Sequence, residues 1–329
     1  MDYLEAIQTN LASPAVLFFV LGLIATAVKT DLRFPEPLYL GLTIYLLVAI
    51  GFKGGVAMSV AGMSAVWLPA LGATALGASI PLWSYPILRF VGRLPAVDAA
   101  AISAHYGSVS AVTFLAAVNY LSELGVPHEP YATAFLAVME SPAIIVGVVL
   151  GKLATRQEGV PFYSVMRLAL HEALLGRSVF LLVGSLLVGF LCGQRGLTAT
   201  AGFFVTPFQG VLALFLLDMG MVAARRFGDL RKVGTFLIGF GILMPVIHGM
   251  AGIILGYSVG LSLGGATLLG VLAASASYIA APAAMRMTLP EANPTLYLTS
   301  ALAITFPFNI TFGLPLYYEL ARWWFGGSK

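Results

Sequence analysis

Apolar runs of about 20 residues recur along the whole chain and are separated by short polar breaks. A run of that length crosses the hydrocarbon core of a bilayer as an α-helix. Of the 329 residues, 59% are hydrophobic and only 9% are charged, against roughly 25% charged in an average soluble domain. A water-soluble core could not bury this much apolar length. The sequence therefore predicts an all-α polytopic membrane protein.

Ten membrane segments fit the pattern of apolar runs and polar breaks best. They cover approximately residues 13–29, 36–52, 65–90, 97–120, 131–151, 174–192, 204–224, 233–257, 264–284 and 295–321. We divide the chain into a first five-helix repeat at 1–155, a cytoplasmic connector at 156–173 and a second five-helix repeat at 174–329. Because five is odd, the second half enters the membrane from the opposite side, so the repeat is inverted.

The strongest sign of the repeat is a pair of polar stretches inside apolar segments. Ser108 and Ser110 in the first half correspond to Ser275 and Ser277 in the second, at a constant offset of 167 residues. Glycine and proline accompany the hydroxyls. Such breakers in the middle of apolar segments are typical of the interrupted helices that line a transporter site. We therefore expect two interrupted helices at the functional site.

The basic residues are distributed unequally over the two sides of the predicted membrane. Lys and Arg number 13 on the side of the connector and 4 on the other, which together account for all 17 in the chain. The positive-inside rule places the richer side in the cytoplasm. Both termini then lie outside.

A charge inside the bilayer costs roughly 2.5–3.5 kcal/mol even on lenient scales, so ionisable residues there are functional candidates, and we single out four. Glu140, two residues before Pro142, is the first candidate for ion coordination. Asp218 could equally pair with a cation on a neighbouring segment. His105 and His248 are more often hydrogen-bonded packing groups, and they are the natural carriers if the coupling ion is H⁺.

An enzymatic function is not indicated. Ser108 or Ser110 beside His105 could be imagined as a nucleophile and base, but no carboxylate is placed to orient the pair. The single cysteine, Cys192, leaves no Cys/His metal spacing. We expect no enzyme, no cofactor, no metal other than Na⁺ as the coupling ion, and no nucleic-acid partner.

Several motifs resemble those of a known family. In chain order they are GFKGGVAM, GSVSAVTF, MESPA, GDLRKV, MPVIHG, AASASYIAAP and ANPTLY. Together they resemble the sodium-dependent bicarbonate transporter family, the SbtA-like permeases, over nearly the whole chain. The resemblance implies ten helices in two inverted halves, a multi-pass protein of the bacterial cytoplasmic (inner) membrane, and bicarbonate and Na⁺ bound where the interrupted helices meet. It also implies a homotrimer and raises a PII-like regulatory protein as a partner.

The resemblance also assigns the site residues by position. The substrate-binding set is Gly107, Ser108, Ser110, Thr113, Ser275, Ala276 and Ser277. The ion-binding set is Glu140, Ser110, Ser277, Tyr278 and Asn309. Tyr278 stands where the family pattern has an Asp, so one hard negative ligand is lost and we expect a Na⁺ stoichiometry near one.

The function that we expect is secondary active import of a small inorganic anion, bicarbonate by resemblance, coupled to Na⁺. The alternatives are an importer of another small anion such as a short carboxylate, and a non-transporting membrane sensor that binds a ligand in the same pocket. For the coupling ion, H⁺ carried by His105 is the rival to Na⁺.

Overall fold

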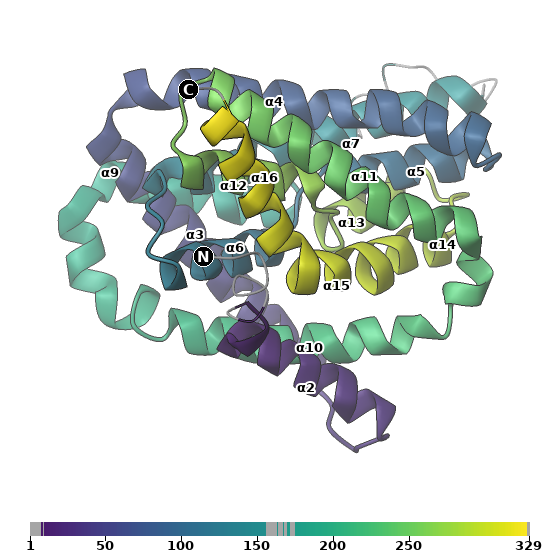
Figure 1. The fold of residues 1–329 in the computed structure, drawn as a ribbon, viewed down its shortest axis with the longest axis horizontal. Coiled ribbons are helices and arrows are strands. Elements are labelled where there is room, and N and C mark those ends of the chain that lie inside the picture. The colour runs from purple at the N-terminus through teal and green to yellow at the C-terminus, as the bar shows by residue number, and fades with distance from the viewer. Residues whose placement is uncertain are drawn as a thin grey trace.

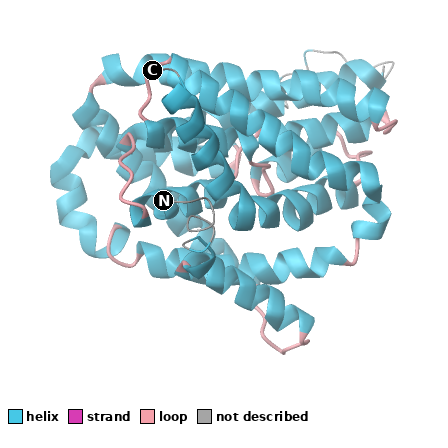
Figure 2. Ribbon diagram, in the orientation of Figure 1, coloured by secondary structure: helices cyan, strands magenta, loops and turns pink. Residues whose placement is uncertain are grey.

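The computed structural model describes residues 8, 10–155, 163, 167, 170, 171 and 175–327. Within this part of the chain the secondary structure is helical throughout, with no strand (Figure 2). The helices are α2 Pro14–Ala27, α3 Glu36–Ala61, α4 Met63–Pro86, η1 Ile87–Val91, α5 Ala96–Gly107, α6 Ala111–Glu123, η2 Pro130–Ala132, α7 Thr133–Thr155, α9 Arg177–Phe204, α10 Phe208–Phe227, α11 Leu230–Ser258, α12 Leu263–Ala274, α13 Ala280–Thr288, α14 Pro294–Thr299, η3 Ser300–Thr305, α15 Phe306–Phe308, η4 Asn309–Gly313 and α16 Leu314–Gly327. Most of the predicted connector, 156–173, lies outside the described residues.

Eight stretches of helix among the described residues are long and apolar enough to cross a membrane. They are Glu36–Ala61, Met63–Val91, Ala96–Glu123, Pro130–Leu153, Arg177–Phe204, Phe208–Phe227, Leu230–Ser258 and Pro294–Gly326. Two shorter apolar helices, α2 and α12, fall in the remaining predicted segments. The all-α membrane fold is thus confirmed, while the count of ten spans stays a prediction.

Two helices from the first half of the chain each pack against a helix from the second half. α3 lies along α9 and α2 lies along α10, and Figure 1 shows α2 crossing α10 at the lower edge of the molecule. A Cβ at Gly22 would overlap the Leu217 carbonyl, and a Cβ at Gly189 would overlap that of Phe52. Glycine at these crossings lets the two backbones touch, as in small-residue packing between membrane helices.

A second group of helices surrounds the predicted interruptions. In the first half α4, α5 and α7 pack together, and in the second half α11, α12 and α16 do so. Ala96 and Gly107 bound α5, while Leu263 and Ala274 bound α12, each end 167 positions later in the chain. The offset first seen between serines therefore also relates whole helices.

Hydrogen bonds at both ends of the bundle show how the two interrupted segments run. The Glu129 carboxylate, beyond the end of α6, accepts bonds from the backbone N and Oγ of Ser262 at the start of α12, at 2.7 and 3.0 Å. Asp98 Oδ1, at the start of α5, accepts a 2.7 Å bond from the backbone N of Asn293, beyond α13. The start of each segment is therefore tied to the end of the other, so the two run in opposite directions.

Candidate functional site

Two helix interruptions form the centre of the site, as the sequence predicts. α5 ends at Gly107 and α6 begins at Ala111, while α12 ends at Ala274 and α13 begins at Ala280. Gly107 keeps an ordinary backbone conformation, and its hydrogen side chain matters for a different reason. A Cβ there would lie 2.6 Å from Pro81 Cδ of α4. Glycine therefore allows α5 to end in close contact with α4.

The two interruptions lie against each other and exchange hydrogen bonds. The Ser277 N–H donates to the His105 carbonyl at 2.8 Å. The Ser110 N–H donates to Ser275 Oγ at 2.9 Å, and that hydroxyl donates to the Leu272 carbonyl at 2.7 Å. Unwound backbone inside a membrane protein must find partners for its polar groups. Here each interruption provides hydrogen-bond partners for polar backbone groups of the other.

Four helix ends meet at this crossing, and their partial charges favour ions of both signs. The amino ends of α6 and α13 are capped by serine oxygens: Ser110 Oγ accepts from Thr113 N at 3.2 Å, and Ser277 Oγ accepts from Ala281 N at 3.2 Å. The carboxyl ends of α5 and α12 present carbonyl groups. Helix amino ends attract anions and carboxyl ends attract cations. The crossing can therefore serve an anion and a cation together.

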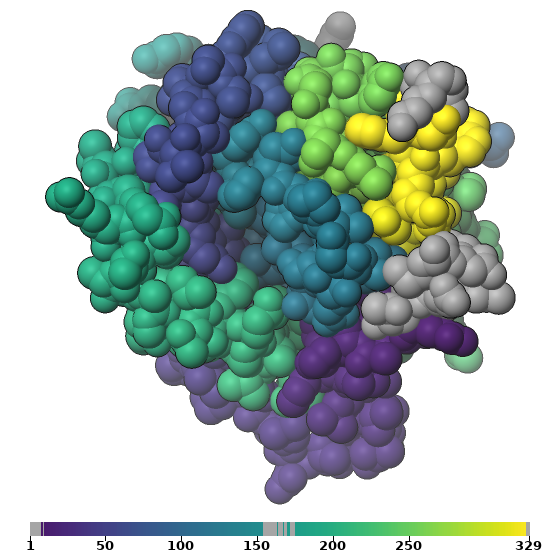
Figure 3. All heavy atoms as spheres, turned by 60° about the vertical axis from the view of Figure 1, so that its left-hand side comes forward, coloured from purple at the N-terminus to yellow at the C-terminus, as the bar shows by residue number. Residues whose placement is uncertain are grey.

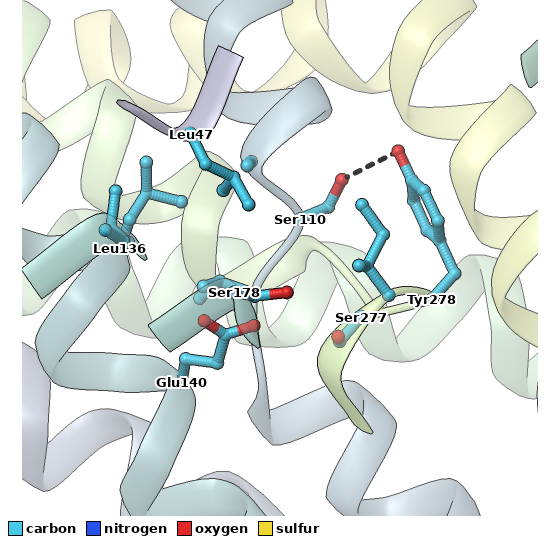
Figure 4. A pocket seen from close by; sticks show the side chains of 11 residues that line it. Leu47, Ser110, Leu136, Glu140, Ser178, Ser277 and Tyr278 are labelled. Carbon is cyan, nitrogen blue, oxygen red and sulfur yellow. Dashed lines mark hydrogen bonds between the residues drawn. The ribbon is translucent and has the colours of Figure 1, made fainter. Parts of the chain in front are cut away.

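A small cavity of about 20 Å³ opens beside the crossing, with room for roughly one water-sized group. Its lining consists of Leu47, Val109, Ser110, Ala111, Leu136, Glu140, Ser178, Leu182, Ser277, Tyr278 and Ile279. Figure 4 shows Glu140 and Ser178 close together in one part of the lining, and the hydroxyls of Ser110 and Tyr278 joined in another. Holding a triatomic or larger anion would require the cavity to widen.

Glu140 is the one carboxylate among the cavity-lining residues. It lies on α7, is only 6% exposed, and points into the cavity (Figure 4). It makes no hydrogen bond or ion pair with any other described residue. A buried carboxylate without a partner is costly, and such a group inside a membrane is a candidate functional residue. Its placement suits a cation that enters the cavity.

Tyr278 closes the side of the cavity opposite Glu140. Its hydroxyl accepts a 3.3 Å bond from Ser110 Oγ, and its ring packs edge-on against Phe306 with the centroids 5.3 Å apart. The phenol fills this position with a neutral oxygen. The cavity therefore carries one acidic side chain, as expected from the loss of an Asp here.

The cavity brings together four of the predicted site residues, namely Ser110, Ser277, Glu140 and Tyr278. The others lie behind it. Thr113 and Ser275 bond to the interruptions, and Asn309 donates to the Ala274 carbonyl at 2.9 Å while accepting from the Tyr317 hydroxyl at 2.7 Å. Gly107, Ser108 and Ala276 are buried without lining the cavity. Ser108 Oγ has no partner among the described residues.

Sequence reasoning did not single out Ser178, which lines the cavity from the second position of α9. It is 8% exposed, and Figure 4 shows it beside Glu140. Leu47 of α3 and Leu182 of α9 complete this wall. The cavity therefore lies at the seam between the α3–α9 pair and the helices that carry the interruptions. Ser178 was missed because it follows Arg177 at a predicted segment boundary, where a serine is unremarkable.

The other ionisable candidates lie away from the cavity lining. His105 bonds through Nδ1 to the Ala101 carbonyl at 2.6 Å and stacks on Tyr297 at 4.5 Å. His248 Nε2 is 3.3 Å from Ser84 Oγ. Both fit the packing interpretation. Asp218 is 6% exposed on α10 and has no ion pair with a described residue, so the structural salt bridge considered for it is absent from this part of the chain.

Interrupted helices that meet around a small cavity with a few polar side chains, in an apolar helical bundle, are typical of one class, the polytopic membrane transporters. The chain belongs to the Na⁺-dependent bicarbonate transporter superfamily, whose family model matches residues 14–322. The resemblance read from the sequence motifs is thereby confirmed. No curated protein matches the chain.

Proposed function

We propose that the protein imports bicarbonate together with Na⁺ across a bacterial cytoplasmic membrane. The observation that carries the proposal is the Glu140 carboxylate, which has no partner among the described residues and lines one cavity with Ser110 and Ser277, at the meeting point of two interrupted helices. Carboxylate, hydroxyl and carbonyl oxygens suit a hard cation. The amino ends of α6 and α13, which meet beside this cavity, carry the partial positive charge that suits the anion.

Charge balance gives a physical reason for coupling the two ions. An interior-negative membrane opposes entry of an anion by about 2.3 kcal/mol per charge per 100 mV. A cation that enters with it removes this cost. Because Glu140 is the single acid lining the cavity, we propose one Na⁺ per transported anion. Na⁺ is favoured over H⁺ carried by His105, since that ring lies outside the cavity lining and bonds to its own helix.

We further propose ten spans in two inverted five-helix repeats, at 1–155 and 174–329, with both termini outside. The opposite directions of the interrupted segments support inversion. Lys29, Arg33 and Arg225 line one cleft, which supports placing these basic turns on a single, cytoplasmic side. A homotrimer and a PII-like regulatory partner are proposed from the family alone.

The function is tested by uptake into proteoliposomes that contain the purified protein. Radiolabelled bicarbonate, formate and acetate are compared at pH 8, each with an inward Na⁺ gradient and with K⁺ in its place. We expect bicarbonate uptake that requires Na⁺ and is saturable. Uptake of acetate or formate in preference to bicarbonate would favour the short-carboxylate alternative. Binding without counterflow of any anion would identify a sensor.

A further inference from the structure

A second cavity lies far from the interruptions, at the turn that joins α2 to α3. It is a cleft of about 430 Å³ lined by Ala25, Thr26, Lys29, Thr30, Leu32, Arg33, Phe34 and Arg225. Three cationic side chains and two hydroxyls face it, and no carboxylate does. In Figure 1 this turn projects beyond the rest of the bundle at the end of α2. The cleft shares no lining residue with the cavity proposed to hold the transported ions.

Among the described residues no ion pair neutralises the positive charges of the cleft, and Arg225 interacts only at longer range with the Asp218 carboxylate. None of Lys29, Arg33 and Arg225 forms an ion pair with another described residue. The neighbouring acid Asp229 is instead engaged by Arg226 at 3.7 Å and Lys232 at 2.8 Å. Asp31 and Glu36 belong to the same connection but do not line the cleft. The cleft is therefore a concentrated site for an anionic group.

The backbone presents Lys29 at an unusual position. The Lys29 N–H donates to the Thr26 carbonyl at 3.1 Å and the Thr30 N–H to the Ala25 carbonyl at 3.0 Å, which closes α2 in a Schellman-type end. Lys29 takes the left-handed conformation, with φ at 57°. Glycine is usual there, because a side chain is disfavoured at positive φ. The chain nevertheless has a lysine at this position, and Lys29 lines the cleft.

An exposed apolar stripe on α2 leads directly to the cleft. Leu17, Leu21, Ile24 and Val28 are 53%, 50%, 50% and 65% exposed. Their spacing of four, three and four residues places them on one face of the helix. Val28 immediately precedes Lys29, and Leu32, itself 41% exposed, lines the cleft. The exposed apolar stripe on α2 therefore ends beside the three cationic side chains of the cleft.

We propose that this cleft binds the phosphate of an anionic phospholipid, with an acyl chain of the same lipid lying along the α2 stripe. Basic pockets between helices at the cytoplasmic end of membrane proteins recognise anionic headgroups, and the adjoining stripe gives the lipid tail an apolar surface. A soluble phosphate would use the cations and leave the stripe unoccupied. The proposal concerns lipid binding and does not depend on the identity of the transported ion.

The test measures which lipids stay bound to the purified protein. Wild type is equilibrated with mixed micelles of phosphatidylglycerol and phosphatidylcholine in equal amounts, and retained lipid is counted by native mass spectrometry. The cleft variant is Arg33→Gln with Arg225→Gln. The matched control is Arg93→Gln with Arg231→Gln, which removes the same charge from exposed arginines outside the cleft. A third variant, Lys29→Gln, provides a milder change if the double variant does not fold.

We expect wild type and control to retain phosphatidylglycerol over phosphatidylcholine by roughly fivefold or more, and the cleft variant to lose most of this preference. Lys29→Gln should lie between them. Equal retention by the cleft variant and the control would overturn the proposal. So would displacement of bound phosphatidylglycerol by inorganic phosphate at millimolar concentration, which would indicate a soluble phosphate.

Discussion

Ser178 and Glu140 face one cavity from helices in different halves of the chain. If Ser178 donates a ligand oxygen, Ser178→Ala should raise the Na⁺ concentration for half-maximal uptake by roughly two- to tenfold, the size of one hydrogen bond. Ser185→Ala is the control, because that hydroxyl on the same helix donates only to the Leu181 and Leu182 carbonyls. Equal responses of the two variants would remove Ser178 from the site.

Tyr278 supplies a neutral oxygen at the cavity wall, hydrogen-bonded to Ser110 at 3.3 Å. Tyr278→Phe removes that oxygen and keeps the ring packed on Phe306. We expect transport to persist with at most a roughly tenfold loss of rate, the upper end for one neutral hydrogen bond. Tyr278→Asp is the informative companion variant. Na⁺ dependence that becomes sigmoidal in Tyr278→Asp would show that this position controls the number of bound Na⁺ ions. Complete inactivity of Tyr278→Phe would contradict the expectation that the Tyr278 hydroxyl is not essential for transport.

His128 lies in the turn between α6 and η2, outside the membrane-spanning segments, and burial lowers its pKa below the usual value of 6.5. The unfolded chain then binds a proton that the folded chain resists, so His128 contributes a loss of stability as the pH falls below about 6.5. His128→Gln should narrow the fall in melting temperature between pH 7.5 and pH 5.5. An unchanged fall would show that His128 does not titrate differently on folding.

At the level of single residues, the sequence predicts the polar centre of the site better than its walls. Glu140, Ser110 and Ser277 stand out because acids and paired hydroxyls are rare in apolar segments. Ser178 and Leu47 do not, since nothing local marks a serine at a helix start or a leucine in an apolar run. Only the packing of α3 and α9 against the interruptions brings them to the cavity.

Among the helices, the close packing of α2 against α10 depends on backbone contact at Gly22. A Cβ there would overlap the Leu217 carbonyl. Gly22→Ala should therefore destabilise the protein by about 1–3 kcal/mol, the range for overpacking. Gly41→Ala on α3 is the control, since no atom lies within 4 Å of its Cβ position and alanine favours a helix. Thermal unfolding in detergent compares them; equal melting temperatures would contradict the close crossing.

The helix interruptions were predictable from glycine, proline and hydroxyls, but the lengths of the elements were not. α2 has 14 residues and α12 has 12, both short of a full span. Hydropathy cannot show where a helix ends inside an apolar run. The ends of α5 and α12 are set by contacts that are distant in sequence, such as the bond from Ser277 N to the His105 carbonyl and the packing of Gly107 on Pro81.

On the face of the molecule drawn in Figure 3, segments of the first half lie next to segments of the second half. The proposed orientation of the whole molecule in the membrane makes a direct prediction. In a Cys192→Ser background, Gly228→Cys probes the turn between α10 and α11, and Ser258→Cys probes the end of α11. A membrane-impermeant maleimide added to intact cells should label Cys at 258 and spare Cys at 228. The reverse pattern would invert the topology, and labelling of both would contradict an α11 that spans the membrane.

We propose that Glu140 is the acid through which Na⁺ entry is coupled to entry of the anion. The most direct measurement is bicarbonate-dependent ²²Na⁺ uptake into proteoliposomes by wild type, Glu140→Gln and the control Glu123→Gln, whose carboxylate is exposed. We predict hyperbolic ²²Na⁺ uptake by wild type and the control, and no bicarbonate-dependent uptake by Glu140→Gln. Bicarbonate-dependent ²²Na⁺ entry that survives in Glu140→Gln, or bicarbonate uptake that needs no Na⁺ and collapses with a protonophore, would contradict the account.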